Sequence, residues 1–275
     1  MTIFSINHKK LIGSVLVRPV KTYLLMKAKT HGWPFVVFWA HRIAGVILVL
    51  YVLFHTYTLS GLNIPESFDA KMKLFQFFPF LIMEWLLAIP VVLHALNGGR
   101  LILYEIFGNR KDQAMLKWIL ILSALYLFLL GLFMAIGNQE ISPLFFWSYM
   151  TVASGCITYV TVSKIRSSGT SVFWKLQRVT GVFLFLMIPG HMLFMHLNPM
   201  IGHNSAAVVA RMGNVFIKTV DLLLIISVYY HGGYGLLSIC RDYIQSGRFQ
   251  YGLSVLIGVV MVIFAWIGVK LILFI

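Results

Sequence analysis

Residues 39–55 read Trp-Ala-His-Arg-Ile-Ala-Gly-Val-Ile-Leu-Val-Leu-Tyr-Val-Leu-Phe-His, and residues 175–191 read Lys-Leu-Gln-Arg-Val-Thr-Gly-Val-Phe-Leu-Phe-Leu-Met-Ile-Pro-Gly-His. Both stretches share one plan at a shift of 136 residues: an arginine, a glycine three residues later and a histidine thirteen residues later. Apolar residues fill most of the remaining positions. Ionisable side chains inside such apolar helices usually have a function. The two stretches therefore predict two related membrane helices.

The repeat continues beyond these two stretches. Acidic residues, histidines and glycines recur at a shift of 137 residues; the related positions are Glu84 and Asp221, His94 and His231, Gly98 and Gly235, and Glu105 and Asp242. Chance agreement of such rare residue types within apolar segments is improbable. The sequence thus indicates an internal repeat, which is the signature of an architecture built from duplicated units.

Composition places the protein in a membrane. Hydrophobic residues make up 60% of the 275 residues and charged residues only 11%, whereas soluble domains carry about 25% charged residues. About 20 apolar residues are needed to cross the hydrocarbon core of a bilayer. Seven stretches meet this need: Ile43–Asn63, Leu74–Gly99, Trp118–Gln139, Ile141–Ser163, Val179–Ala210, Thr219–Cys240 and Phe249–Val269.

These stretches predict an all-α integral membrane protein with seven transmembrane helices. Two parallel three-helix repeats require one additional crossing between them, which the Ser/Thr-containing stretch Ile141–Ser163 supplies. The expected division is a basic N-terminal segment (1–32), a first repeat (33–140), a linker helix (141–170) and a second repeat (171–275). The core is expected to be a four-helix bundle contributed by both repeats.

The distribution of positive charge predicts the orientation. With the N-terminus in the cytoplasm, the inner segments hold seventeen Lys/Arg residues and the outer segments hold five, as the positive-inside rule requires. Residues 1–32 have no long apolar core and are not expected to be a signal peptide. We therefore expect a multi-pass protein of the cytoplasmic (inner) membrane. The net charge of +14 follows from this orientation, and no motif for nucleic acid accompanies it.

The four histidines within the spans predict two haem sites. Bis-histidine ligation places one imidazole on each face of the haem iron, between facing helices. At 1.5 Å per residue, His94 and His231 lie about 9 Å from the inner face, and His55 and His191 lie about 20 Å from it. We expect the first pair to hold a proximal haem b and the second pair a distal one.

Further residues are expected around the haems. Glycines let a porphyrin or a helix come close, and arginines pair with propionates because guanidinium matches carboxylate geometry. The candidate residues are Gly45, Gly98, Gly181 and Gly235 for packing, and Arg42, Arg178 and Arg241 for the propionates. The two cysteines, Cys156 and Cys240, stand alone, which argues against a disulfide framework, a zinc site or an iron–sulfur cluster.

These motifs resemble the cytochrome b membrane anchors of succinate dehydrogenases and fumarate reductases. The N-terminal half is similar to the larger anchor subunit in Arg18-Pro19, in His41-Arg42-Ile-Ala-Gly45, and in His94 with Gly98 and Arg100. The C-terminal half is similar to the smaller anchor subunit in His231, Gly235 and Asp242-Tyr243. The chain therefore looks like both anchor subunits fused in one.

The resemblance implies a function and partners. A flavoprotein subunit and an iron–sulfur subunit of the same complex would exchange electrons with membrane quinone, ubiquinone or menaquinone, through this anchor. Arg42 and Tyr243 would line the proximal quinone site, His41 would lie near the haem propionates, and His94 with His231 would ligate the proximal haem. The chain has no GxGxxG flavin motif and no cysteine cluster, so we expect no succinate chemistry on this chain alone.

Other interpretations remain open from the sequence. The chain is compatible with a di-haem cytochrome b anchor of another dehydrogenase, such as one for formate or hydrogen. It is also compatible with a haem-free transporter made of parallel repeats, in which histidines and acids carry protons. For Glu84 and Asp221 the sequence allows an interfacial position, a proton relay or a distal quinone site.

Overall fold

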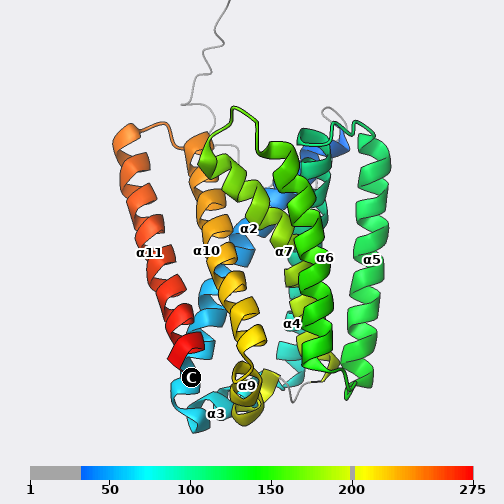
Figure 1. Ribbon diagram of the computed structural model, residues 1–275, viewed down its shortest axis with the longest axis vertical. Helices are drawn as coiled ribbons and strands as arrows, with labels where there is room; N and C mark the ends of the chain where they lie inside the picture. Colours follow the sequence, from blue (N-terminus) through cyan, green and yellow to red (C-terminus); the bar gives the residue numbers. More distant parts are fainter. Residues whose placement is uncertain (1–31, 199–201, 275) are drawn as a thin grey trace, which may run out of the picture. The chain divides into compact units, whose positions relative to one another are not determined.

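The computed structural model describes residues 32–198 and 202–274, and these residues form helices and no strand (Figure 1). The basic segment predicted for residues 1–32, with the exception of Gly32, and the motif Arg18-Pro19 lie outside the described residues. The longer helices are α2 (Trp33–Leu59), α4 (Phe78–Glu105), α5 (Asp112–Ile136), α6 (Pro143–Ile165), α7 (Val172–Leu197), α10 (Val215–Tyr243) and α11 (Gly247–Phe274). Shorter elements are η2 (Ser60–Asn63), α3 (Pro65–Phe75) and α9 (Ser205–Met212).

The chain divides into two units, Met1–Trp39 and Ala40–Ile275. The described part of the first unit is the beginning of α2, where the rings of Phe35 and Phe38 lie 6.5 and 6.2 Å from the ring of Trp39. The second unit holds the rest of α2 and all of the other described helices. The sites discussed below belong entirely to the second unit.

Six helices among the described residues are long and apolar enough to span a membrane, namely α2 with η2, α4, α5, α7, α10 and α11. The protein is therefore a multi-pass, all-helical membrane protein. Helix α6 covers most of the predicted stretch Ile141–Ser163, but it is not among these six. The seventh crossing stays a prediction. The stretch Val179–Ala210 is expected to be broken near Asn198–Pro199, and in agreement with this α7 ends at Leu197 and α9 begins at Ser205.

Two polar residues of α6, Ser154 and Thr161, are buried in the protein. Ser154 is fully buried and donates a hydrogen bond to the carbonyl of Phe183 on α7 at 2.8 Å. Thr161 is buried and donates to the carbonyl of Ile157 in its own helix at 2.9 Å. Hydroxyls satisfied in this way do not require water. The modest hydropathy of α6 thus reflects its packing against α7.

Local sequence sets the ends of several helices. Ser142, Ser171 and Asn214 cap α6, α7 and α10, because each side chain accepts a hydrogen bond from the first turn of its helix. Pro143 occupies the first position of α6, where a missing N–H costs nothing. Gly137 follows the last residue of α5, and its φ of 62° suits glycine.

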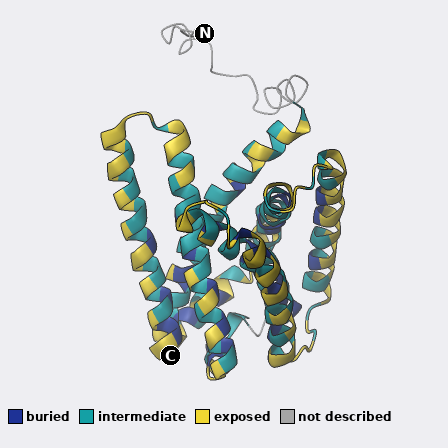
Figure 2. Cartoon of the chain, turned by 45° about the horizontal axis from the view of Figure 1, so that its top comes forward, coloured by how far each residue is buried: buried dark blue, intermediate teal, exposed yellow. Residues whose placement is uncertain are grey.

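Within the second unit, α4 packs on α5 and α7, α10 packs on α7 and α11, and α6 packs on α7 (Figure 1). A cluster of buried residues around Trp147, Met187 and Phe194 fills the space between α6, α7 and α10. Exposed residues run along the whole length of the outer helices (Figure 2), and they include large apolar ones such as Phe128 and Val262. Apolar side chains in these positions suit contact with lipid.

The predicted repeat boundaries fall between helices. Residues 33–140 contain α2 to α5, residues 141–170 contain α6, and residues 171–275 contain α7 to α11. In each predicted repeat a short helix, α3 or α9, follows the first long helix. The carboxylate of Asp69 on α3 accepts hydrogen bonds from the backbone N–H and the hydroxyl of Ser205 on α9, at 2.8 and 2.9 Å. A negative charge is favourable at this helix N-terminus.

We expect Asp69→Ala to destabilise the protein by about 1 kcal/mol, because two donors at the start of α9 lose their acceptor. Thermal unfolding of the detergent-solubilised protein would measure this effect. Glu66→Ala is the matched variant, because Glu66 lies exposed in the first turn of α3, the helix that also carries Asp69. An equal change in unfolding temperature for both variants would contradict the prediction.

Candidate functional site

His94 on α4 and His231 on α10 face each other at one level of the second unit. Their ring centroids are 6.1 Å apart and their planes are nearly perpendicular, at 89°. Both side chains are half-buried, although both lie inside long apolar helices. The two predicted repeats each contribute one member of this inner pair. The structure thus brings together two residues that are 137 positions apart in the sequence.

Backbone carbonyls fix which ring nitrogen of each inner histidine carries the proton. Nδ1 of His94 donates to the carbonyl of His41 on α2 at 3.1 Å, and Nδ1 of His231 donates to the carbonyl of Gln177 on α7 at 3.3 Å. A proton on Nδ1 leaves Nε2 as the nitrogen with a lone pair. Metal-binding histidines commonly have this arrangement, in which a carbonyl orients the ring.

His55 on α2 and His191 on α7 form a second, outer pair. Their centroids are 6.3 Å apart and their planes meet at 84°. On α2, His55 lies ten residues beyond Gly45, which contacts His94. The two pairs are therefore separated by more than two helical turns along α2.

The separations within both pairs fit two imidazoles on opposite sides of one metal ion. An imidazole nitrogen binds a transition metal at about 2 Å and the ring centroid lies roughly 1 Å further away, so the two centroids would be about 6 Å apart. The measured values of 6.1 and 6.3 Å agree with this estimate. In both inner histidines the proton lies on Nδ1, which leaves the lone pair of Nε2 for a metal ion. The residues present therefore suit bis-histidine haem ligation at two levels.

The four glycines contact side chains of the inner site. A Cβ atom at Gly45 would lie 3.1 Å from Cε1 of His94, and one at Gly181 would lie 3.0 Å from Cε1 of His231. Gly98 and Gly235 are less crowded, because their nearest neighbours would be His41 at 3.7 Å and Gln177 at 3.9 Å. Packing of porphyrin against these glycines stays a prediction.

Arg42 and Tyr243 are brought together by α2 and the last turn of α10. Nη1 of Arg42 donates to the hydroxyl of Tyr243 at 2.9 Å, and the same guanidinium forms an ion pair with Asp242. Tyr243 and Asp242 are both exposed, while Arg42 is half-buried. The two residues predicted to line a quinone site thus form one polar group at the end of the helices.

A related ion pair joins Arg178 to Glu105. The distances from Nε and Nη2 of Arg178 to Oε2 of Glu105 are 2.8 and 2.6 Å. Arg178 corresponds to Arg42 by the repeat, and Glu105 corresponds to Asp242. Each arginine therefore binds an acid from the other predicted repeat. Arg241 is exposed in the last turn of α10, unlike these two arginines.

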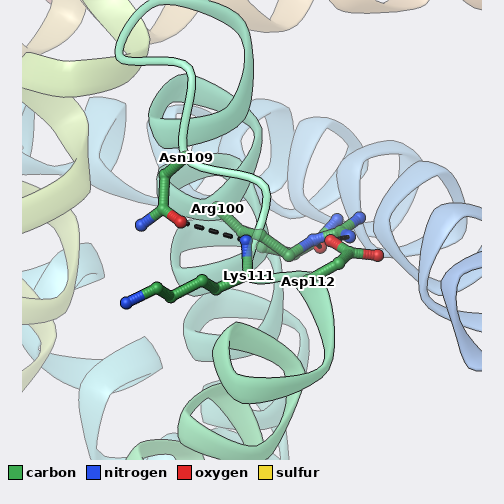
Figure 3. A network of polar contacts seen from close by, with 5 residues as sticks. Arg100, Asn109, Lys111 and Asp112 are labelled. Atoms are coloured by element: carbon green, nitrogen blue, oxygen red, sulfur yellow. Dashed lines mark hydrogen bonds and ion pairs between the residues drawn. The ribbon is translucent and has the colours of Figure 1, made fainter.

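A buried polar network surrounds Arg100 and was not predicted from the sequence. This arginine is only 9% exposed; its Nε donates to Oδ1 of Asn97 at 2.8 Å, and it forms an ion pair with Asp112 at the start of α5. In the adjoining loop, Oδ1 of Asn109 accepts from the backbone N–H of Lys111 at 3.0 Å (Figure 3). Arg100 follows His94 by six residues on α4. The sequence offered one signal for this network, which is that Arg100 is an arginine without a counterpart in the second repeat.

His41 stacks on His94, with centroids 4.0 Å apart and planes only 4° from parallel. The repeat places Gln177 in the corresponding position, and Nε2 of Gln177 donates to the carbonyl of His231 at 3.2 Å. Neither contact was predicted. Because His41 is already engaged with the ring of His94, its expected place near the haem propionates stays a prediction.

Aromatic residues flank the outer pair and were also missed. The ring of Trp147 on α6 lies 5.9 Å from the ring of His191, and the ring of Tyr51 lies 5.6 Å from the ring of His55. Trp147 is fully buried, so α6 supplies part of the wall of the outer site. No signal in the sequence linked Trp147 to His191, because α6 has no counterpart in either repeat.

The two intramembrane acids have basic neighbours. Oε2 of Glu84 lies 3.4 Å from Nε2 of His196 on α7. Asp221 lies near Arg211 on α9: burial lowers the pKa of Arg211, and the carboxylate of Asp221 acts in the opposite direction. His196 also lies inside a span, but the structure places His191 opposite His55.

The fold and the site together define a multi-pass helical membrane protein in which two related halves join their histidines inside the spans. The sequence model of a family described as succinate dehydrogenase/fumarate reductase transmembrane subunit matches residues 17–131 and 159–269, which together are most of the chain. The chain belongs to this family of cytochrome b type membrane anchor subunits. Two separate matches to the same family agree with two anchor units fused in one chain. Comparisons with curated proteins and with solved structures gave no match.

Proposed function

We propose that this anchor subunit carries electrons between a docked iron–sulfur subunit and membrane quinone through two b haems. The proposal rests on two pairs of facing imidazoles in a chain of this family. The ring centroids are 6.1 Å apart in the inner pair and 6.3 Å apart in the outer pair. A pair of intramembrane histidines that binds no metal ion would bury polar ring nitrogens without a partner, which costs free energy. Two such pairs suit two metal centres placed in series.

In this proposal His94 and His231 hold the inner haem, and His55 and His191 hold the outer one. When bound, haem b supplies one-electron transfer by cycling between the ferric and ferrous states of its iron. The carbonyls of His41 and Gln177 keep Nε2 of the inner histidines available as ligands. Arg42 and Arg178 lie toward the same end of the helices and would bind propionates.

Arg42 and Tyr243 would bind one carbonyl oxygen of the quinone. Both are hydrogen-bond donors, and reduction to quinol requires protons at the two carbonyl oxygens. The phenol of Tyr243 accepts a hydrogen bond from Arg42, which stabilises the phenolate that forms when Tyr243 gives up its proton. Asp242 holds the guanidinium of Arg42 beside the phenol. The exposure of Tyr243 lets a membrane-dissolved quinone reach it.

The iron–sulfur and flavoprotein subunits would dock at the end of the helices that carries Arg42 and Tyr243. This end is nearer to the inner histidine pair, so the inner haem would be within reach of both the iron–sulfur subunit and quinone. By the charge distribution of the sequence, the same end is cytoplasmic. The cytoplasmic membrane is therefore the proposed location.

Haem quantification on the purified complex tests this proposal. We expect pyridine haemochrome analysis to give two b haems per anchor chain, and we expect a flavoprotein and an iron–sulfur subunit to co-purify. One haem per chain would remove the outer pair from the proposal. No haem, or co-purification with an unrelated dehydrogenase, would overturn it.

A further inference from the structure

The inner histidines sit in two copies of one arrangement. In each copy, the Nδ1–Cε1 edge of a histidine on α4 or α10 lies against a neighbouring helix, α2 or α7. There it contacts the backbone carbonyl of one residue and the glycine four positions after that residue. The carbonyl and glycine are those of His41 and Gly45 for His94, and those of Gln177 and Gly181 for His231. We call each carbonyl–glycine pair a histidine seat. Each predicted repeat supplies the seat for its own histidine.

The spacing of four residues has a physical reason. In an α-helix the carbonyl of residue i points toward residue i+4, and the side chain of residue i+4 screens that carbonyl from the side. A glycine at i+4 removes the screen, so a neighbouring helix can approach closely. The carbonyl then accepts a second hydrogen bond, from the imidazole of the facing histidine. The seat therefore requires a glycine at position 45 and at position 181.

Distances show how little room the seats leave. A Cβ atom at position 45 would lie 3.1 Å from Cε1 and 3.4 Å from Nδ1 of His94. A Cβ atom at position 181 would lie 3.0 Å from Cε1 and 3.3 Å from Nδ1 of His231. Contacts this short would push the ring away from the carbonyl. An alanine would therefore weaken the hydrogen bond and turn the imidazole.

We propose that Gly45 and Gly181 are positioning residues that hold the two inner imidazole planes perpendicular to each other on a shared haem iron. This inference rests on the proposed haem ligation and adds the cause of the ring orientation. The hydrogen bond and the glycine contact each restrict rotation of the ring, and the resulting angle between the planes is 89°. The outer pair has a similar angle of 84° but no such glycine seat among its described contacts.

The angle between axial imidazole planes has a spectroscopic consequence. Near-perpendicular planes give a ferric low-spin haem a strongly anisotropic electron paramagnetic resonance signal, whereas parallel planes give a rhombic one. We expect the oxidised wild-type complex to show strongly anisotropic signals for both haems. A rhombic signal for the inner haem of the wild type would overturn the inference without any variant.

Alanine substitutions test the seats directly. Gly45→Ala and Gly181→Ala should each shift the signal of the inner haem toward the rhombic form, and should leave the signal of the outer haem unchanged. A weaker hydrogen bond to Nδ1 makes the ligand less basic, so the midpoint potential of the inner haem should rise. Loss of the hydrogen bond from Nδ1 to the carbonyl should also weaken the binding of the inner haem, by about tenfold or more.

Gly155→Ala on α6 and Gly258→Ala on α11 are matched variants, because a Cβ atom at either position would meet nothing within 4 Å. We expect both to retain the wild-type signals and potentials. Spectra of Gly45→Ala and Gly181→Ala that equal those of Gly155→Ala would overturn the inference while haem ligation stands. A wild-type complex without haem would instead overturn the proposed function, so the two failures are distinguishable.

Discussion

We expect the replacement of His231 by alanine to reduce the haem content of the complex from the proposed two per chain to one. His231 lies opposite His94 at a centroid distance of 6.1 Å, and without His231 only the imidazole of His94 would be left to hold the proposed inner haem. Electron transfer from the iron–sulfur subunit to quinone should fall by at least about a hundredfold, because a required one-electron carrier is lost. Pyridine haemochrome analysis and quinone reduction by the purified complex measure both effects.

His196→Ala is the matched variant for this substitution. His196 is also an intramembrane histidine, but its Nε2 lies 3.4 Å from Oε2 of Glu84, so its ring is engaged with a carboxylate. The variant should retain two haems per chain. The assignment of ligands fails if His196→Ala loses a haem and His231→Ala does not.

The second large effect is expected for Tyr243→Phe, which removes a single hydroxyl at the proposed quinone site. A positioned proton donor contributes about a hundredfold or more to such reactions, so we expect quinone reduction to slow by about a hundredfold. Reduction of the haems by the iron–sulfur subunit should continue, because the histidine pairs are untouched. Stopped-flow spectroscopy separates these steps: the haems should become reduced normally and then be reoxidised slowly by added quinone.

Tyr251→Phe provides the comparison for this effect. Tyr251 also carries an exposed phenol near an end of a spanning helix, at the beginning of α11. Its substitution should leave reoxidation at the wild-type rate. Equal rates in both variants would place the quinone away from Tyr243.

Much of this arrangement was predictable from the sequence because rare residues mark it. The repeated arginines, glycines and histidines lie in otherwise apolar segments, so their spacing predicted the helices and paired His94 with His231 and His55 with His191. The family resemblance placed Arg42 and Tyr243 in one site, and the structure brings them within hydrogen-bonding distance. Six of the predicted spans are also helices that can cross a membrane in the structure.

Contacts made by residues outside the repeat were not predictable. Trp147 belongs to α6, which has no counterpart elsewhere in the chain, so nothing in the sequence connected it with His191. The seat carbonyls are backbone atoms, which have no residue signature of their own. The bond between Arg100 and Asp112 depends on how the loop after α4 returns to α5. Periodicity locates a helix face, but it does not define which neighbour covers that face.

The crossed pairing of Arg42 with Asp242 and of Arg178 with Glu105 has a consequence for how the protein is made. In each ion pair the arginine and the acid belong to different halves, so a half synthesised alone would lack the acid that its arginine binds here. A single gene removes this difficulty, since translation delivers the two complementary sets of charges in equal amounts and tethered to each other.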